Sequence, residues 1–302
     1  MRTPPSTAHR PSSPCGPRTL AVAGLAHALH DGYTDLIYVL LPIWQTQFGL
    51  GYGLLALMRG LYAGLMAALQ VPAGRLAERL GGRVVLALGT VLAAFGYALA
   101  GFSGDLIGLC AGLALSGAGS STQHPTASAA VARAYGIKAR GPLGTYNFTG
   151  DLGKAALPAA TSLLLALMPW RQALEWLAVL GLAVAGVVIV FMPPVATVLA
   201  GEKISTDAKE GNGRGGFAIL FVLGVLDTAA RMGLLTFLPF LLQAKGAALP
   251  TVGFAPVLYG VVGDLAGPSW GAALTAGTAL LTWPVALRLA PHLRPAATRT
   301  AI

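Results

Sequence analysis

Long apolar segments alternate with short polar ones along most of this chain. The apolar segments cover residues 20–48, 52–71, 84–102, 106–131, 143–168, 173–192 and 217–242. Because a helix rises about 1.5 Å per residue, a segment of this length crosses the roughly 30 Å hydrocarbon core of a bilayer. The pattern therefore predicts an all-α polytopic membrane protein, with six spanning helices before residue 195 and a seventh soon after it.

A charged, glycine-rich segment interrupts this alternation at residues 195–216. It has no apolar period, which is typical of a flexible linker. After the seventh segment, residues 253–263 are too few to cross a membrane, whereas residues 271–290 could cross it once. We therefore expect about eight full spans and one half-length or re-entrant segment near Pro256–Asp264. The predicted organisation is a cytoplasmic tail (1–19), an N-terminal six-helix bundle (20–194), a cytoplasmic linker (195–216) and a partial C-terminal bundle (217–302).

The composition agrees with a membrane protein. Only 10% of the residues are charged and 55% are hydrophobic, whereas a soluble domain carries about 25% charged residues. A net charge of +9 would suggest a nucleic-acid partner for a soluble protein. Here the basic residues lie in tails and loops next to the predicted spans, where the positive-inside rule accounts for them. We therefore expect a lipid bilayer, and no nucleic acid, as a partner.

Lysine and arginine residues also predict the orientation. They precede the first apolar segment and follow the second, fourth and sixth, whereas the alternate loops hold little beyond Arg171. Since short cytoplasmic loops carry the excess of Lys and Arg, the N-terminus is predicted to be cytoplasmic, in a bacterial inner (cytoplasmic) membrane. Cys15 lies in a Pro/Ser-rich tail and Cys110 in an apolar segment, so the cysteines predict neither a disulfide nor a metal site.

The first apolar segment carries four ionisable residues in its interior: His27, His30, Asp31 and Asp35. An Asp at the centre of a spanning helix costs about 2.5–3.5 kcal/mol on insertion scales. The polar side of this helix must therefore face protein or a water-filled path, and such residues are candidates for function. Counted from the nearest predicted cytoplasmic Arg or Lys at about 1.5 Å per residue, His27 and His124 each lie about 13 Å into the membrane and Asp151 about 16 Å. We expect them to share one site near the midplane.

Further polar residues occur at helical spacing inside later segments. They are Asn147, Asp151 and Lys154 in the fifth segment, Asp227 and Arg231 in the seventh, and Arg59 in the second. Asp151 and Lys154, at i and i+3, either only neutralise each other or also bind substrate or protons. The same two interpretations apply to Asp227 and Arg231. For Asp35 and Arg59, towards the outer side, a structural ion pair is the favoured interpretation.

The segment GRLAERLGGR at residues 74–83 follows the pattern G-x-L-[AGS]-D-[RK]-x-G-[RK]-[RK] in most positions. It resembles the cytoplasmic signature of the major facilitator superfamily, with Glu78 in place of the usual Asp and Gly82 in place of a basic residue. The matching residues proposed for gating are Gly74, Glu78, Arg79, Gly81 and Arg83. The resemblance implies a tight turn whose acid caps and pairs across a seam between helix bundles. The alternative is a merely basic cytoplasmic loop, and in either case Pro72–Arg83 is expected to be the loop between the second and third spans.

Two further stretches narrow the resemblance. HALHD at residues 27–31 and GAGSSTQHPTAS at residues 117–128 are similar to the first and fourth helices of fosmidomycin-resistance-type efflux proteins. By position, His27, Asp31, His124 and Pro125 correspond to that group. The chain departs from it at His30, where the group tends to have Asn, at Thr126, where it tends to have Glu, and at the charged Asp151 and Lys154.

The resemblance implies a secondary active transporter that exports a small molecule or drug by alternating access, as a drug-resistance antiporter driven by the proton gradient. It implies no cofactor and no metal. Asp31 is the expected proton carrier, with His27 and His124 as partners, because a carboxylate in a partly dry site can bind and release a proton as its hydration changes. An enzyme is not expected, since the sequence has no nucleophile elbow, phosphate loop or HExxH spacing.

Two alternatives stay open. An uptake symporter of a small organic solute has the same fold, because direction follows coupling and not architecture. A truncated, non-transporting membrane remnant is the other, since facilitators have twelve spans in two halves and this chain shows one complete half. Residues 255–267 and 270–290 resemble the end of the eleventh helix and the twelfth helix of a facilitator. This predicts an internal loss of helices near Gly253–Pro256.

Overall fold

The computed structural model describes residues 15–194 and the helical positions 216, 218, 219, 221, 222, 225, 236, 239 and 240. The chain divides into two compact units, Met1–Leu199 and Ala200–Ile302, and the fold below is that of the first. The predicted linker up to residue 215, the half-length segment and the last predicted span lie outside the described residues, as do Asp227 and Arg231.

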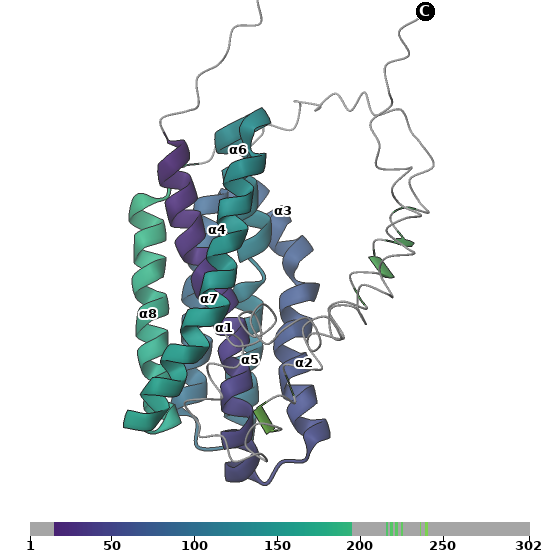
Figure 1. Cartoon of the computed structure of the whole chain (residues 1–302), viewed down its shortest axis with the longest axis vertical. Helices are drawn as coiled ribbons and strands as arrows, with labels where there is room; N and C mark the ends of the chain where they lie inside the picture. Colours follow the sequence, from purple (N-terminus) through teal and green to yellow (C-terminus); the bar gives the residue numbers. More distant parts are fainter. Residues whose placement is uncertain are drawn as a thin grey trace, which may run out of the picture. The chain divides into compact units, whose positions relative to one another are not determined.

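The first unit is a bundle of helices (Figure 1). In chain order they are α1 (Gly16–Phe48), α2 (Tyr52–Ala68), α3 (Gln70–Leu80), α4 (Gly82–Phe102), α5 (Leu106–Ser120), the π-helix η1 (His124–Ser128), α6 (Ala129–Tyr135), the 3-10 helix η2 (Gly136–Lys138), α7 (Arg140–Leu167) and α8 (Trp170–Phe191). The six predicted spans correspond to α1, α2, α4, the broken run α5–α6, α7 and α8.

Helix α1 is the core of this unit. Its side chains are buried almost without interruption from Val22 to Pro42, including Tyr33, Leu36 and Leu40. A helix that is buried all round has neighbours on every side, and α1 packs most extensively on α7, with further contacts to α8, α2 and η1. The prediction that the polar side of the first span faces protein is confirmed, because His27 and Asp31 are both buried.

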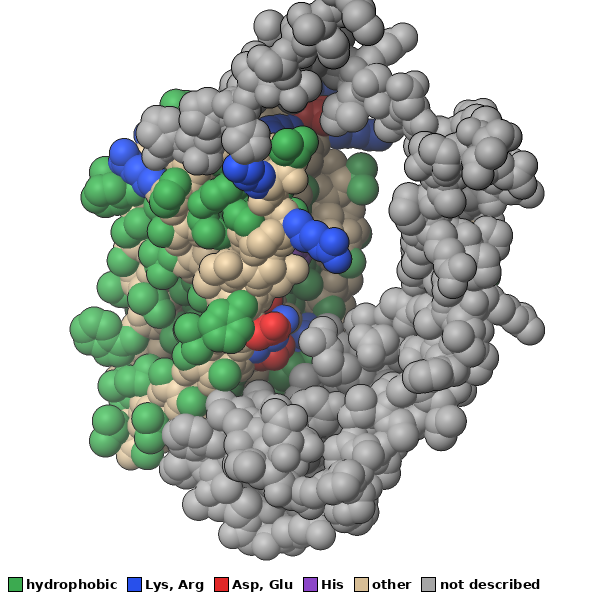
Figure 2. All heavy atoms as spheres, turned by 45° about the horizontal axis from the view of Figure 1, so that its top comes forward, with side chains coloured by type: hydrophobic (Ala, Val, Ile, Leu, Met, Phe, Trp, Pro, Cys, Tyr) green, Lys and Arg blue, Asp and Glu red, His purple; other side chains and the backbone are tan. Residues whose placement is uncertain are grey.

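By length and mean hydropathy, fewer of the described helices qualify as membrane spans than the six that the alternation of apolar and polar segments predicts. Within the described residues, α4 and α8 are each long and apolar enough to cross a membrane, and α2 with α3 forms one more candidate span bent by 41°. Helices α1 and α7 are as long but contain the ionisable residues of the site, and α5 ends after 15 residues. Figure 2 shows hydrophobic side chains over much of the visible side of the bundle.

Two predicted boundaries were wrong. Residues 72–83 were expected to form a loop, but Gln70–Leu80 is helix α3 and the turn is confined to Gly81, whose φ is 89°. Pro72 does not break α3 because it lies in the first turn, where the backbone N–H has no helical partner. The fourth span is not one continuous helix. Pro125 cannot donate a backbone hydrogen bond, and the chain forms a π-helix around it.

Helices α1 and α7 approach each other closely because small residues line the contact. Gly153 lies against the carbonyl of Ala28, where a side chain would not fit, and a Cβ atom at Gly32 would lie 2.7 Å from the Cβ atom of Leu157. Small residues at such positions are what lets two spanning helices pack backbone to backbone. This contact fixes the register in which α7 presents its polar residues to α1.

Candidate functional site

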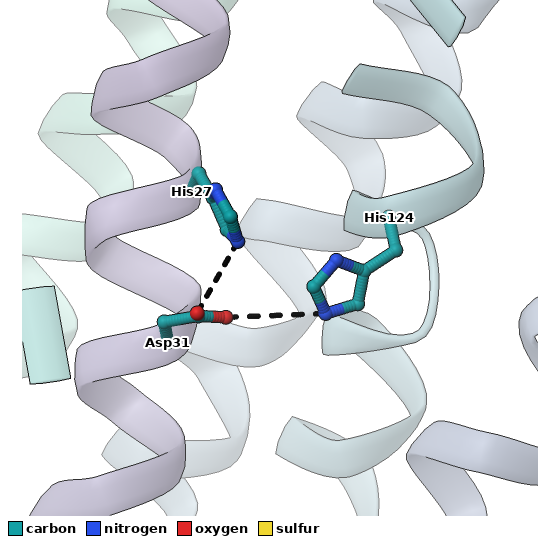
Figure 3. A group of neighbouring side chains, drawn as sticks. All are labelled: His27, Asp31 and His124. Carbon is teal, nitrogen blue, oxygen red and sulfur yellow. Dashed lines mark ion pairs between the residues drawn. The ribbon is translucent and has the colours of Figure 1, made fainter. Parts of the chain in front are cut away.

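The carboxylate of Asp31 is the centre of a polar cluster inside the bundle. Its Oδ2 atom lies 3.2 Å from Nε2 of His27 and 3.1 Å from Nζ of Lys154, and its Oδ1 atom lies 3.9 Å from Nε2 of His124. Figure 3 shows the imidazoles of His27 and His124 turned towards this carboxylate from two different elements. Because α1, η1 and α7 each contribute, the fold assembles the cluster from three segments that are distant in the sequence.

The backbone of α7 sets the orientation of His27. Its Nδ1 atom lies 2.9 Å from the carbonyl oxygen of Tyr146, and a carbonyl only accepts, so Nδ1 carries a hydrogen. The His27 ring also stacks on the Tyr146 ring at 4.1 Å and 18°. The Tyr146 hydroxyl in turn accepts a 2.5 Å hydrogen bond from Nε2 of Gln123. These contacts point Nε2 of His27 at Asp31.

This orientation requires a proton between His27 and Asp31. A neutral His27 with its hydrogen on Nδ1 has a lone pair on Nε2. An ionised Asp31 would then place a second acceptor 3.2 Å away. Two buried acceptors facing each other are unfavourable, so the pair is stable when a proton is shared between the two groups.

Lys154 joins a buried carboxylate to an exposed one. Its ammonium lies 3.1 Å from Asp31 and 3.0 Å from Oδ1 of Asp151, one turn before it on α7. The Asp31 side chain is 11% exposed, whereas that of Asp151 is 70% exposed. Lys154 therefore pairs with Asp31 across the helix contact as well as with Asp151, and binding of substrate or protons by the Asp151–Lys154 pair stays a prediction.

The π-helix η1 carries His124 towards the cluster. π-helices are rare and often occur at functional sites, because the wider turn redirects a side chain. His124 lies at its start, with its side chain 43% exposed, and its ring meets the His27 ring edge-on at 5.3 Å. The hydroxyl of Ser128 bonds the His124 carbonyl at 2.5 Å. Unlike His27, His124 therefore reaches the surface of the described unit.

His30 belongs to a second, separate polar chain. The Thr90 hydroxyl donates to the Leu86 carbonyl at 2.8 Å, so it accepts from Nε2–H of His30 at 3.0 Å. Nδ1 of His30 then accepts from Ser120 at 3.1 Å, and the Ser120 oxygen accepts from the Tyr62 hydroxyl at 3.0 Å. Both ring nitrogens are engaged by hydroxyl groups, so the structure does not bring His30 into contact with the Asp31 carboxylate.

The remaining predicted site residues lie apart from the cluster. Asn147 is exposed on α7, one turn before Asp151. Asp35 and Arg59 are both buried, and the Arg59 guanidinium lies 4.8 Å from the centre of the Tyr38 ring. The predicted ion pair between Asp35 and Arg59 stays a prediction.

Most of the signature segment lies in helix α3, and its tight turn is confined to Gly81. Gly74, Glu78 and Arg79 lie in α3, and Arg83 lies in the first turn of α4. Glu78 is exposed and forms no ion pair with the residues that the structure describes, so the expected capping role of this acid is not seen. At Gly74, α3 packs on η1, because a Cβ atom there would lie 3.6 Å from the Cβ atom of Pro125.

Three residues of the site escaped the sequence analysis: Tyr146, Gly150 and Gln123. Tyr146 holds His27, and Gly150 leaves room for it, since a Cβ atom at Gly150 would lie 2.6 Å from Cε1 of His27 and 2.7 Å from Oδ2 of Asp31. The signal was present as the i, i+4, i+7 spacing of Tyr146, Gly150 and Gly153 along one face of α7.

The sequence of this chain matches the model of a known protein family over most of its length. The family model of the Major Facilitator Superfamily matches residues 23–290. The chain belongs to this superfamily. This match confirms the superfamily that the sequence signature indicated. Superfamily members are multi-pass membrane proteins of the transporter type and are generally not enzymes. Nothing in the comparisons singles out the fosmidomycin-resistance-type group, and that narrower resemblance stays a hypothesis.

Solved structures of superfamily-type transporters share the fold. A bacterial homologue of the human lysosomal transporter Spinster, inward-facing and unoccupied, has a TM-score of 0.64 and 18% identity, over 84% of this chain and 62% of that one. A POT family transporter in complex with a thioalcohol-conjugated peptide has a TM-score of 0.54 and 18% identity, over 81% of this chain and 52% of that one. The chain thus spans less than two thirds of their lengths. The comparison with curated proteins gave no significant match.

Proposed function

We propose that this chain is a proton-coupled secondary transporter that exports a small molecule by alternating access. In this proposal Asp31 is the proton carrier, His27 and His124 are its proton-sharing partners, and Lys154 and Asp151 form the adjoining substrate face. No cofactor takes part, and the proton gradient supplies the energy. The N-terminus is proposed to lie in the cytoplasm of a bacterium, with the protein in the inner membrane.

The contact between His27 and Asp31 carries this proposal. Its two facing acceptor atoms call for a shared proton, and that proton lies in a buried part of the bundle. With it, the formal charges of Asp31, Asp151, Lys154 and a protonated His27 sum to zero, and without it the cluster is left with one negative charge. Without the proton, the lone pair of His27 Nε2 and the carboxylate of Asp31 face each other in a buried site. Two facing acceptors are unfavourable, so loss of the proton favours a conformation in which water or substrate reaches Asp31.

The other side of the cluster supports exchange with a substrate. His124 and Lys154 are partly exposed, at 43% and 27%, and both contact Asp31. A substrate that binds these two side chains competes with their contacts to Asp31, and so changes how firmly Asp31 holds its proton. In secondary transporters the sites for the substrate and the coupling ion lie together near the bilayer midplane.

The proposed orientation is supported by where the basic residues lie. Helix α1 starts at the end of the bundle at which α6 lies (Figure 1), and most of the visible Lys and Arg side chains gather towards that end (Figure 2). Positive residues concentrate on the cytoplasmic side of membrane proteins. A cytoplasmic N-terminus follows from this rule.

A second candidate is a membrane protein that inserts but does not transport. The observation that favours it is the length of the match, since the chain spans 62% of the Spinster homologue. Alternating access places a site between two halves of a transporter, so a shortened second half would leave the site without one wall. Uptake in place of efflux is a variant of the first candidate and uses the same residues.

The deciding experiment measures proton movement in inverted membrane vesicles that contain the full chain. A pH gradient is established, and cationic dyes such as ethidium and anionic drugs such as fosmidomycin are added in turn. Transport predicts a substrate-dependent collapse of the gradient, which Asp31→Asn abolishes at equal membrane abundance. No collapse with any compound, from well-inserted protein, would support the non-transporting candidate. Accumulation of the compound inside inverted vesicles indicates efflux, and its loss from them indicates uptake.

A further inference from the structure

We propose that His27, Asp31 and His124 form a binding site for a divalent transition-metal cation such as Zn²⁺, with Lys154 as the built-in competitor of the metal. This proposal is separate from the proposed transport function, because it concerns the binding of a metal ion by these three side chains and not the movement of a substrate across the membrane. The cysteine spacing gave no sign of such a site, since its ligands come from α1 and η1 and are two imidazoles and a carboxylate.

The positions of the three donor atoms suit a small cation. One donor atom from each residue lies within 4.8 Å of the other two. Zn²⁺ holds nitrogen and oxygen ligands at about 2.0–2.2 Å, so neighbouring ligands in a tetrahedral site are roughly 3.3–3.5 Å apart. His27 and Asp31, at 3.2 Å, already have this spacing. His124, at 3.9 Å, reaches it by a small rotation, for which its 43% exposed side chain has room.

The donor atom of His27 is also prepared for a metal. Its Nδ1 atom donates to the Tyr146 carbonyl, so the lone pair of the neutral ring lies on Nε2 and faces Asp31. Histidines that bind metals usually donate their second ring hydrogen to a carbonyl or carboxylate, which fixes the ring in this way. The stacked Tyr146 ring holds the imidazole in place.

A cation can replace the proton that the pair requires. The two acceptor atoms of His27 and Asp31 need a positive centre between them, and a metal ion supplies one as well as a proton does. Imidazole and carboxylate together suit Zn²⁺, Ni²⁺ or Co²⁺, whereas Mg²⁺ and Ca²⁺ prefer sites made of oxygen atoms. The donor set therefore points to a transition metal.

Lys154 opposes this binding and explains how it can be controlled. Its ammonium lies 3.1 Å from Asp31 Oδ2, where it repels a dication. The same ammonium lies 3.0 Å from Asp151, so Lys154 can leave Asp31 without losing a counter-ion. The metal site is thus complete when Lys154 pairs with Asp151 only. Deleting the charge of Lys154 should strengthen metal binding.

The test titrates ZnCl₂ into the full chain, purified in detergent without a histidine tag, in competition with a chromophoric zinc chelator. We expect one Zn²⁺ per chain, bound at least about tenfold more tightly by Lys154→Met than by the wild type. Removing the like charge of Lys154 lowers the repulsion on the bound cation, and a gain of about 1.4 kcal/mol in binding free energy is a tenfold lower Kd. His124→Ala, made in the Lys154→Met background, should weaken binding by at least about tenfold. MgCl₂ should not compete.

A gain of affinity in Lys154→Met cannot be produced by misfolding, and His124→Ala changes a half-exposed residue outside the tightly packed core.

His9→Ala is the matched control, since it removes a histidine from the N-terminal tail, and should leave binding unchanged. Bound Co²⁺ should give the intense visible absorption of a four-coordinate site. The proposal is overturned if neither protein binds Zn²⁺, if Lys154→Met does not tighten binding, or if His124→Ala leaves it unchanged. The assay has no membrane and no gradient, so it fails or succeeds independently of transport.

Discussion

The ammonium of Lys154 lies 3.1 Å from Oδ2 of Asp31, although the two residues come from different helices of the bundle. The contact bridges α1 and α7 next to Gly153, where α7 packs on the backbone of Ala28. It also leaves the second carboxylate, Asp151, on the exposed side. The structure thus separates a buried half of the ion cluster from an exposed half, and substitutions on the two halves should behave differently.

Lys154→Met should destabilise the protein more than Asp151→Asn. Removing the lysine leaves the buried Asp31 with one positive partner fewer, and breaking a buried ion pair costs several kcal/mol when nothing replaces it. Because His27 remains, we expect a fall in the apparent melting temperature of roughly 5 °C. Asp151→Asn removes an exposed partner, worth about 0–1 kcal/mol. Thermal unfolding in detergent measures both, and equal shifts would contradict the assignment.

Gly150→Ala should displace His27 from Asp31. A Cβ atom at this position would lie 2.6 Å from Cε1 of His27 and 2.7 Å from Oδ2 of Asp31, so one of the two groups must move. We expect at least about a tenfold loss of proton-coupled activity, since misplacement of a reacting group by about 1 Å has effects of this size or larger. Gly144→Ala is the control on the same helix, where a Cβ atom meets no neighbour within 4 Å. It should keep full activity.

His30 should act by positioning helices and not by carrying protons. Replacing His30 by Ala removes the acceptor of the buried Ser120 hydroxyl, which costs about 1–3 kcal/mol, whereas Thr90 keeps its hydrogen bond to the Leu86 carbonyl. We expect lower stability, and an unchanged pH profile of transport per folded molecule. The double variant His30→Ala/Ser120→Ala should be less destabilised than the sum of the single variants, because the two share one hydrogen bond. A shifted pH profile would instead place His30 in the proton pathway.

The signature helix should be linkable to the π-helix by a disulfide. A Cβ atom at Gly74 would lie 3.6 Å from the Cβ atom of Pro125, within the 3.5–4.5 Å that a disulfide needs. Gly74→Cys/Pro125→Cys, in a chain whose Cys15 and Cys110 are replaced by Ser, should cross-link on mild oxidation. Gly64→Cys/Pro125→Cys is the control, since position 64 has no neighbour within 4 Å. Cross-linking of both pairs, or of neither, would contradict this packing.

The sequence predicted the helices well because apolar length is a local property. Each predicted span before residue 195 has a matching helix except the fourth, which is broken at η1. The burial of the polar residues of α1 follows from the cost of exposing them to lipid. The interpretation of Pro72 as a loop residue was wrong, because the effect of a proline depends on its position within the helix. Sequence does not state that position directly.

The site was predicted in part, for a related reason. His27 was expected to be a partner of Asp31, and the structure places the two side chains 3.2 Å apart, four residues apart on one helix. His124 was also expected as a partner, whereas Lys154 was paired only with Asp151. The contact of Lys154 with Asp31 depends on the register of α7 against α1, which local sequence patterns do not contain. The carbonyl of Tyr146 orients His27, and a backbone group of this kind has no signature in the sequence at all.

The most direct test of the account compares two transport modes of Asp31→Asn in proteoliposomes, with a compound that gives a proton signal in vesicles. Counterflow exchanges labelled for unlabelled compound without any gradient, and it needs alternating access but no change of protonation. We expect Asp31→Asn to keep counterflow and to lose accumulation driven by a pH gradient. Accumulation at the wild-type level in Asp31→Asn would contradict the central claim that Asp31 carries the coupling proton.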